Sequence, residues 1–98
     1  MNKLKDIQIN PFQLNRLLST EQQAGYAELL NRAVYCTTCS GLCTKGVVVT
    51  EIHLNDMNNI LIQGTCKVCN GKVARIMEFG ENLTFFENAN EFRKELMD

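Results

Sequence analysis

Residues 36–41 read Cys-Thr-Thr-Cys-Ser-Gly, and residues 66–71 read Cys-Lys-Val-Cys-Asn-Gly. Both stretches follow the pattern Cys-x-x-Cys-x-Gly, and 26 residues, 40 to 65, separate the two cysteine pairs. A Cys-x-x-Cys pair can direct two thiolates at one ion across a tight turn, so two pairs supply the four ligands of a tetrahedral site. Glycine after each pair would permit a positive φ while backbone amides turn toward the sulfurs. We therefore predict one metal site, with the ligands Cys36, Cys39, Cys66 and Cys69.

The residues around the second pair predict three strands. Residues 47–54 and 60–65 are rich in β-branched side chains, and the polar stretch 55–59 between them has turn chemistry. This pattern indicates a hairpin that brings the two cysteine pairs together. Residues 73–79 alternate in character and predict a third strand, which Gly80 would end.

The cysteine spacing and the three predicted strands resemble a zinc ribbon of the broad rubredoxin-like class over residues 35–80. The resemblance implies a small antiparallel ribbon that holds one Zn²⁺ per chain. Iron, as in rubredoxin, is less favoured because the cysteine turns contain no proline and the chain has no tryptophan. Zinc ribbons occur in many kinds of protein, so the resemblance predicts the site and not the biological role.

Helices are predicted on both sides of the ribbon. Asn10 and Pro11 can cap and begin a short helix, and a second helix over about residues 20–34 could use Ser19 or Thr20 in a capping box. Residues 84–97 form an amphipathic pattern, with a capping box predicted at Thr84 and an apolar stripe of Phe85, Ala89, Phe92 and Leu96. Residues 1–9 are expected to be a loose tail. The prediction is a single α+β domain, residues 1–98: a helical arm (10–34), a three-stranded antiparallel zinc ribbon (35–80) and a C-terminal helix (84–97).

Composition favours a cytoplasmic protein. The chain has 98 residues, 45% of them hydrophobic, and a formal net charge of −1. It shows no secretory signal and no apolar run long enough to cross a bilayer. In a reducing compartment, five cysteines favour metal binding over disulfides. Cys43 is interpreted as an apolar packing position, and His53, roughly 23 Å from the knuckle at ~3.3 Å per residue, as a rim residue near the hairpin tip.

The same residues argue against catalysis and favour binding. A site closed by four cysteines leaves no position for an activated water, and the carboxylates Glu51, Glu78 and Glu81 have no histidine or serine at a catalytic spacing. We therefore predict a non-enzymatic protein-interaction module. Its helical arm would contact either an unidentified protein partner or the arm of a second copy, which would form a homodimer. The C-terminal helix should cover one face of the sheet, which would leave several arm residues exposed: Phe12, Leu14, Leu17, Leu18, Leu29 and Leu30. Nucleic-acid binding is the alternative. In that case basic residues of the ribbon would contact phosphate instead of only offsetting the charge of the metal site: Lys45, Lys67, Lys72 and Arg75.

Overall fold

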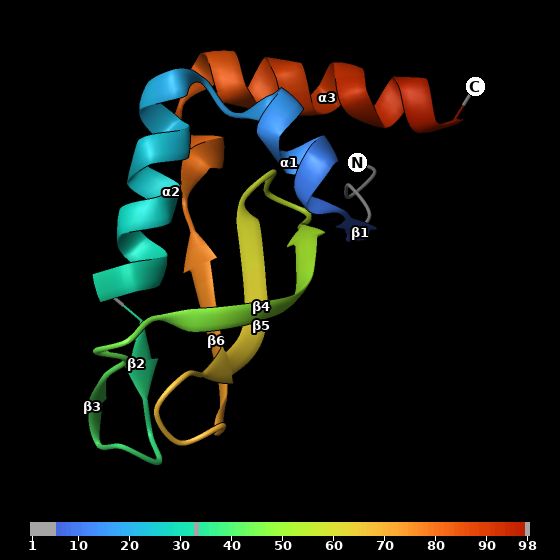
Figure 1. Cartoon of the computed structure of the whole chain (residues 1–98). Helices are drawn as coiled ribbons and strands as arrows, with labels where there is room; N and C mark the ends of the chain where they lie inside the picture. The colour runs from blue at the N-terminus through green and yellow to red at the C-terminus, as the bar shows by residue number, and fades with distance from the viewer. Residues whose placement is uncertain (1–5, 33, 98) are drawn as a thin grey trace.

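The described residues form a four-stranded antiparallel sheet, a two-stranded sheet and three α-helices. A computed structural model describes residues 6–32 and 34–97. The main sheet has the order β1 (Ile7–Ile9), β4 (Val47–Leu54), β5 (Ile60–Cys66) and β6 (Lys72–Met77), and the small sheet pairs β2 (Tyr35–Cys36) with β3 (Gly41–Leu42). Figure 1 shows the small sheet at the end of the molecule opposite helices α1 (Pro11–Leu17) and α3 (Leu83–Met97).

The prediction of three strands was wrong by one, because the expected tail contains β1. Residues Ile7–Ile9 pair with β4, and Ile9 is buried against the larger core. Without β1, the backbone of β4 would be an open edge, and the alternating apolar side chains Ile7 and Ile9 suit that edge. The remainder of the predicted tail, residues 1–5, lies outside the described residues.

The predicted hairpin forms, with Leu54 opposite Ile60 at its tip and Val47 opposite Cys66 at its base. A bulge interrupts the pairing between Val49 and Glu51. Gly64 faces this part of β4, and a Cβ there would collide with the carbonyl oxygen of Val48. The third predicted strand ends at Met77 rather than at Phe79, since residues Phe79–Glu81 form the 3-10 helix η1.

The predicted helices form, with changed ends. A capping box on Asn10 begins α1, and one on Ser19 begins α2 (Thr20–Arg32). The prediction that α2 reaches residue 34 was wrong. Asn82, and not Thr84, caps α3, since its Oδ1 accepts a hydrogen bond from the Phe85 amide at 3.0 Å. No helix in the described part of the chain is long and apolar enough to span a membrane.

The buried side chains form two clusters. The larger cluster joins the main sheet to the helices: Ile9, Leu14, Leu17, Leu18, Ile52, Leu54, Ile60, Ile62, Met77, Phe85, Ala89 and Phe92. The smaller cluster lies at the cysteine end: Val34, Cys36, Cys43, Val47, Cys66 and Val73. Leu96 is half exposed, so the predicted apolar stripe of α3 ends at Phe92, and Figure 1 shows the last turns of α3 extending beyond the sheet.

The expectation that the arm leaves an exposed apolar face was wrong for most of its residues. The three leucines of the first helical segment, Leu14, Leu17 and Leu18, are buried, and Leu29 and Leu30 pack against the larger cluster. Ile9 of the fourth strand belongs to the same buried cluster as Leu14 and Leu17, so β1 contributes to the core that buries the arm. Phe12 differs, because 81% of its surface is exposed.

Candidate metal centre

The fold brings the two cysteine pairs together at the base of the hairpin. Cys36 ends β2 and Cys39 lies in the turn before β3, while Cys66 ends β5 and Cys69 lies in the turn before β6. The four Sγ atoms all lie within 4.8 Å of one another. The cysteines that the sequence predicts as ligands are thus gathered in one cluster, close enough to bind a single ion.

The sulfur separations suit a shared ion and not disulfide bonds. Cys36 Sγ lies 3.5 Å from Cys69 Sγ, and Cys39 Sγ lies 3.9 Å from Cys66 Sγ. A disulfide bond would require about 2.05 Å. A tetrahedron with Zn–S bonds of ~2.3 Å has sulfur–sulfur edges of about 3.8 Å. The cluster therefore has the dimensions of a tetrahedral four-thiolate site.

Comparisons with protein-family models, curated proteins and solved structures found no match for this chain. The likeness to a zinc ribbon therefore depends on the chain's own geometry. That geometry includes a four-cysteine cluster of zinc-ribbon type and an antiparallel sheet of four strands, where a ribbon of three was expected.

Each cysteine turn uses a left-handed residue, but not the predicted glycine. Ser40 and Asn70 have φ angles of 56° and 61°, whereas Gly41 and Gly71 are not among the residues with positive φ. Gly71 is needed for space instead, because a Cβ there would lie 2.8 Å from Thr38 Oγ1 and 3.2 Å from Cys69 Sγ. The absence of a side chain at residue 71 therefore lets the two turns approach closely, while Gly41 has open space around it.

Backbone amides favour thiolates at the first cysteine of each turn. Hydrogen bonds from the backbone of Cys69 and then Val68 lower the pKa of Cys66 to about 6, and a hydrogen bond from the backbone of Cys39 lowers the pKa of Cys36. By contrast, the pKa of Cys39 is raised to about 12, first by its hydrogen bond to the Cys69 sulfur. Sulfurs this close repel one another when they are all ionised, and a bound cation would remove that penalty.

The fifth cysteine lies beside the cluster without joining it. Cys43 is buried in the smaller apolar cluster, and its backbone amide donates to the Val34 carbonyl at 2.8 Å. Burial raises the pKa of its thiol to about 12. The prediction of a packing role for Cys43 is confirmed by this environment.

His53 lies far along β4 from the cysteines, as the sequence predicted. Its Nδ1 lies 3.0 Å from Asp6 Oδ1, and its Nε2 lies 3.7 Å from Glu51 Oε1. Sequence reasoning missed the contact with Asp6 because residues 1–9 were expected to be loose. The three groups link β1 to β4 and take no part in the cysteine cluster.

Exposed lysines and apolar side chains surround the cysteine cluster. Lys67 lies within the second turn, Lys72 begins β6, and Lys45 lies in the turn before β4. Arg75 is three residues further along β6 and is therefore more distant. Sequence reasoning did not single out the half-exposed apolar residues on the same end: Tyr35, Leu42, Val48 and Val68. For Tyr35 and Leu42 the signal was weak because β2 and β3, which contain them, have two residues each.

Proposed function

We propose that this chain is a zinc-binding module that acts by binding a protein partner and not by catalysis. The observation that supports zinc binding is the convergence of four thiol groups within 4.8 Å. Cys36, Cys39, Cys66 and Cys69 would hold the ion, which would supply a structural cross-link between the two turns. Four protein ligands fill a tetrahedral zinc site, so no coordination position is left for a substrate or an activated water.

The surroundings of the cluster favour a structural role for the metal. Three of the six buried residues in the smaller cluster are themselves cysteines: Cys36, Cys43 and Cys66. The remaining three are valines, so this end of the molecule buries little purely apolar surface. Small domains with a limited core commonly depend on a metal or another cross-link. Zinc would therefore stabilise this end, and the nearby lysines would offset the formal −2 charge of a zinc four-thiolate centre.

Metal content and chelation test the metal site. We expect the purified chain to contain one zinc ion by elemental analysis. A strong chelator should reduce the circular-dichroism signal as the cysteine end unfolds, because structural zinc contributes about 10–16 kcal/mol in small peptides. Cys66→Ser should abolish zinc binding. Cys43→Ser is the matched control and should retain it. Iron in place of zinc would favour the rubredoxin-like electron-transfer alternative, which an absorption spectrum detects.

The ligand assignment has its own refutation. If Cys43→Ser loses zinc while Cys39→Ser keeps it, Cys43 and not Cys39 is the ligand. If the wild-type chain folds fully without any metal, the proposed role of the cluster is wrong.

Exposed apolar residues support the protein-binding part of the proposal. They lie at the cysteine end of the molecule and on the helical arm. On the arm, the side chain of Phe12 is exposed. Two copies of the chain could form a homodimer through a contact at this residue. Light scattering of the wild type and of Phe12→Ser tests this: a dimer mass that falls only in the variant supports contact through the arm. A monomeric wild type with the same mass as the variant excludes the homodimer.

Nucleic-acid binding is the second candidate, and one observation favours it. Lys45, Lys67 and Lys72 are exposed at the cysteine end of the molecule, where the side chain of Tyr35 is also exposed and could stack on a base. A fluorescent single-stranded oligonucleotide should then bind the zinc-loaded chain with a steep salt dependence, and charge reversal of the three lysines should abolish binding. Absence of binding at low salt would exclude this candidate.

A further inference from the structure

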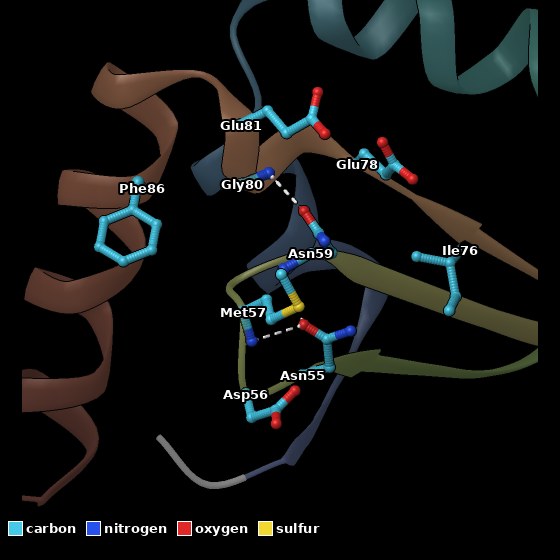
Figure 2. A pocket seen from close by; sticks show the side chains of 9 residues that line it. All are labelled: Asn55, Asp56, Met57, Asn59, Ile76, Glu78, Gly80, Glu81 and Phe86. Carbon is cyan, nitrogen blue, oxygen red and sulfur yellow. Dashed lines mark hydrogen bonds between the residues drawn. The ribbon is translucent and has the colours of Figure 1, made fainter. Parts of the chain in front are cut away.

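An open pocket of about 540 Å³ lies at the end of the molecule opposite the cysteine cluster. It is bordered by the loop between β4 and β5, the end of β6, η1 and the first turns of α3, as Figure 2 shows. The hairpin separates it from the cysteines by about seven residues, or roughly 23 Å at ~3.3 Å per residue. The pocket is therefore a separate feature from the candidate metal centre.

Apolar side chains form part of the wall and remain accessible. Met57 on the loop is 65% exposed and Ile76 on β6 is 52% exposed, and Phe86 of α3 lies on the other side. This wall can accept the aliphatic part of a ligand.

The rim carries negative charge. Glu78 and Glu81 lie beside each other on one side of the pocket, and Asp56 lies on the loop. Neither Glu78 nor Glu81 forms an ion pair with another residue in the part of the chain that the structure describes, whereas Asp56 interacts with the charge of Arg93. The pKa of Glu81 is raised, first by its hydrogen bond with the Glu78 carboxyl and then by the charge of that group. A cation near both carboxylates would relieve this repulsion.

A buried amide supplies a second, independent feature. Asn59 lines the pocket although only 7% of its surface is exposed. Its Oδ1 accepts a hydrogen bond from the Gly80 amide at 2.8 Å, as Figure 2 shows. Its Nδ2 makes no hydrogen bond with any residue that the structure describes, and it is not sealed from solvent. The pocket therefore contains a fixed donor that is free to meet an acceptor such as a peptide carbonyl.

We propose that this pocket binds a lysine or arginine side chain of a partner protein. The aliphatic stem lies along Met57 and Ile76, the cationic group lies between the carboxylates, and a main-chain carbonyl of the partner accepts from Asn59 Nδ2. The pocket's volume falls within the usual range for ligand sites. This inference rests on the proposed function as a protein-binding module, and it names the chemistry of the partner.

Other ligand classes fit this pocket less well. Anionic ligands, including nucleic acid, would be repelled by the three carboxylates. A divalent cation needs converging ligand atoms, and within residues 6–32 and 34–97 the grouping that meets this condition is the cysteine cluster alone. A purely apolar ligand would leave the carboxylates and the amide donor unused.

Nuclear magnetic resonance of the zinc-supplied chain tests the proposal with synthetic peptides. The probes are acetyl-Gly-Gly-Arg-Gly-Gly-amide and its lysine counterpart, and the matched controls carry citrulline and acetyl-lysine, which keep the shape and lose the charge. We expect the charged peptides to shift the Gly80 backbone amide and the Asn59 side-chain amide at up to about 10 mM peptide. The double variant Glu78→Gln/Glu81→Gln should weaken binding by about tenfold or more.

A control variant and a separate metal measurement decide between outcomes. Glu91→Gln removes an exposed carboxylate on α3 outside this pocket and should leave peptide binding unchanged. The proposal is overturned if the charged peptides cause no shift, if the neutral peptides bind equally well, if the double variant binds normally, or if the shifts cluster at the cysteine turns. Zinc content is measured on the same samples: zinc retained without peptide binding refutes this inference alone, whereas absence of zinc refutes the metal site.

Discussion

Arg93→Met should destabilise the protein by about 2–4 kcal/mol. Arg93 projects from α3 and is 9% exposed, and its Nε donates to Asn58 Oδ1 at 2.9 Å. Its Nη2 also donates to the carbonyl oxygens of Asn55 and Leu54. Asn58 is fully buried with φ of 58°, so the variant leaves its side-chain oxygen without this donor. An unsatisfied buried acceptor costs about 1–3 kcal/mol and a hydrogen bond to a charged group contributes about 1.5–3 kcal/mol, terms that overlap in part.

Urea unfolding followed by circular dichroism measures this effect. A chain of 98 residues has a total stability of about 5–15 kcal/mol, so the predicted loss is a large fraction and moves the midpoint clearly. Lys94→Met is the matched control, because Lys94 is the neighbouring residue, carries the same charge and is exposed. A double-mutant cycle with Asn58→Gly, which keeps the left-handed backbone accessible, should show coupling of at least about 0.5 kcal/mol. The reasoning is refuted if Arg93→Met costs no more than Lys94→Met.

Three further predictions concern the sheet, the pocket rim and the arm. Gly64→Ala should cost at least about 2 kcal/mol in urea unfolding, because the new Cβ collides with the carbonyl oxygen of Val48; an unchanged midpoint would contradict the bulged pairing. Glu81→Gln should stabilise the protein at neutral pH and not below the usual pKa of 4.5, because the Glu78 carboxyl raises the pKa of Glu81, so its favourable contribution is present at low pH and lost as the pH rises through the raised value. Thermal unfolding at both ends of this range checks the sign, and a gain at low pH would be contrary to it. Leu14→Ala should cost about 2–5 kcal/mol, since Leu14 is 1% exposed; a loss below 1 kcal/mol would mean that the arm does not pack as described.

The strongest local patterns predicted the centre of the fold. The β-branched runs and the polar stretch 55–59 predicted the hairpin, and the two Cys-x-x-Cys pairs predicted the cluster at its base. These signals are local, since strand periodicity and turn chemistry act over a few residues. The left-handed residue of the second turn is Asn70 and not the predicted glycine, because asparagine also tolerates this region.

The features that depended on distant partners were missed. β1 has three residues, too few for a periodic signal, and its pairing is decided by the open edge of β4. The capping-box spacing of Thr84 and Glu87 favoured Thr84, whereas Asn82, an equally good capping residue without that spacing, begins the helix. The arm leucines are buried in a cluster that includes Ile9 of β1, a strand that had not been predicted. The hydrogen bond from Arg93 to Asn58 joins residues that are 35 positions apart in the sequence, and no sequence pattern is informative over that separation.

The division of the interior into two clusters implies two cooperative unfolding units. The larger cluster is formed by side chains of the helices and of most of the main sheet, whereas the smaller cluster is formed by side chains at the cysteine end. Leu30 packs against both clusters. Amide hydrogen exchange should then show slow exchange along β5 near Ile62 and faster exchange around residues 36–43 when the metal is withheld. The chain would respond to metal shortage by local opening and not by global denaturation. The pocket that we propose to bind a lysine or arginine side chain lies at the opposite end and would keep its shape in that state. Metal supply would therefore alter the cysteine end of the protein and leave this pocket able to bind its partner.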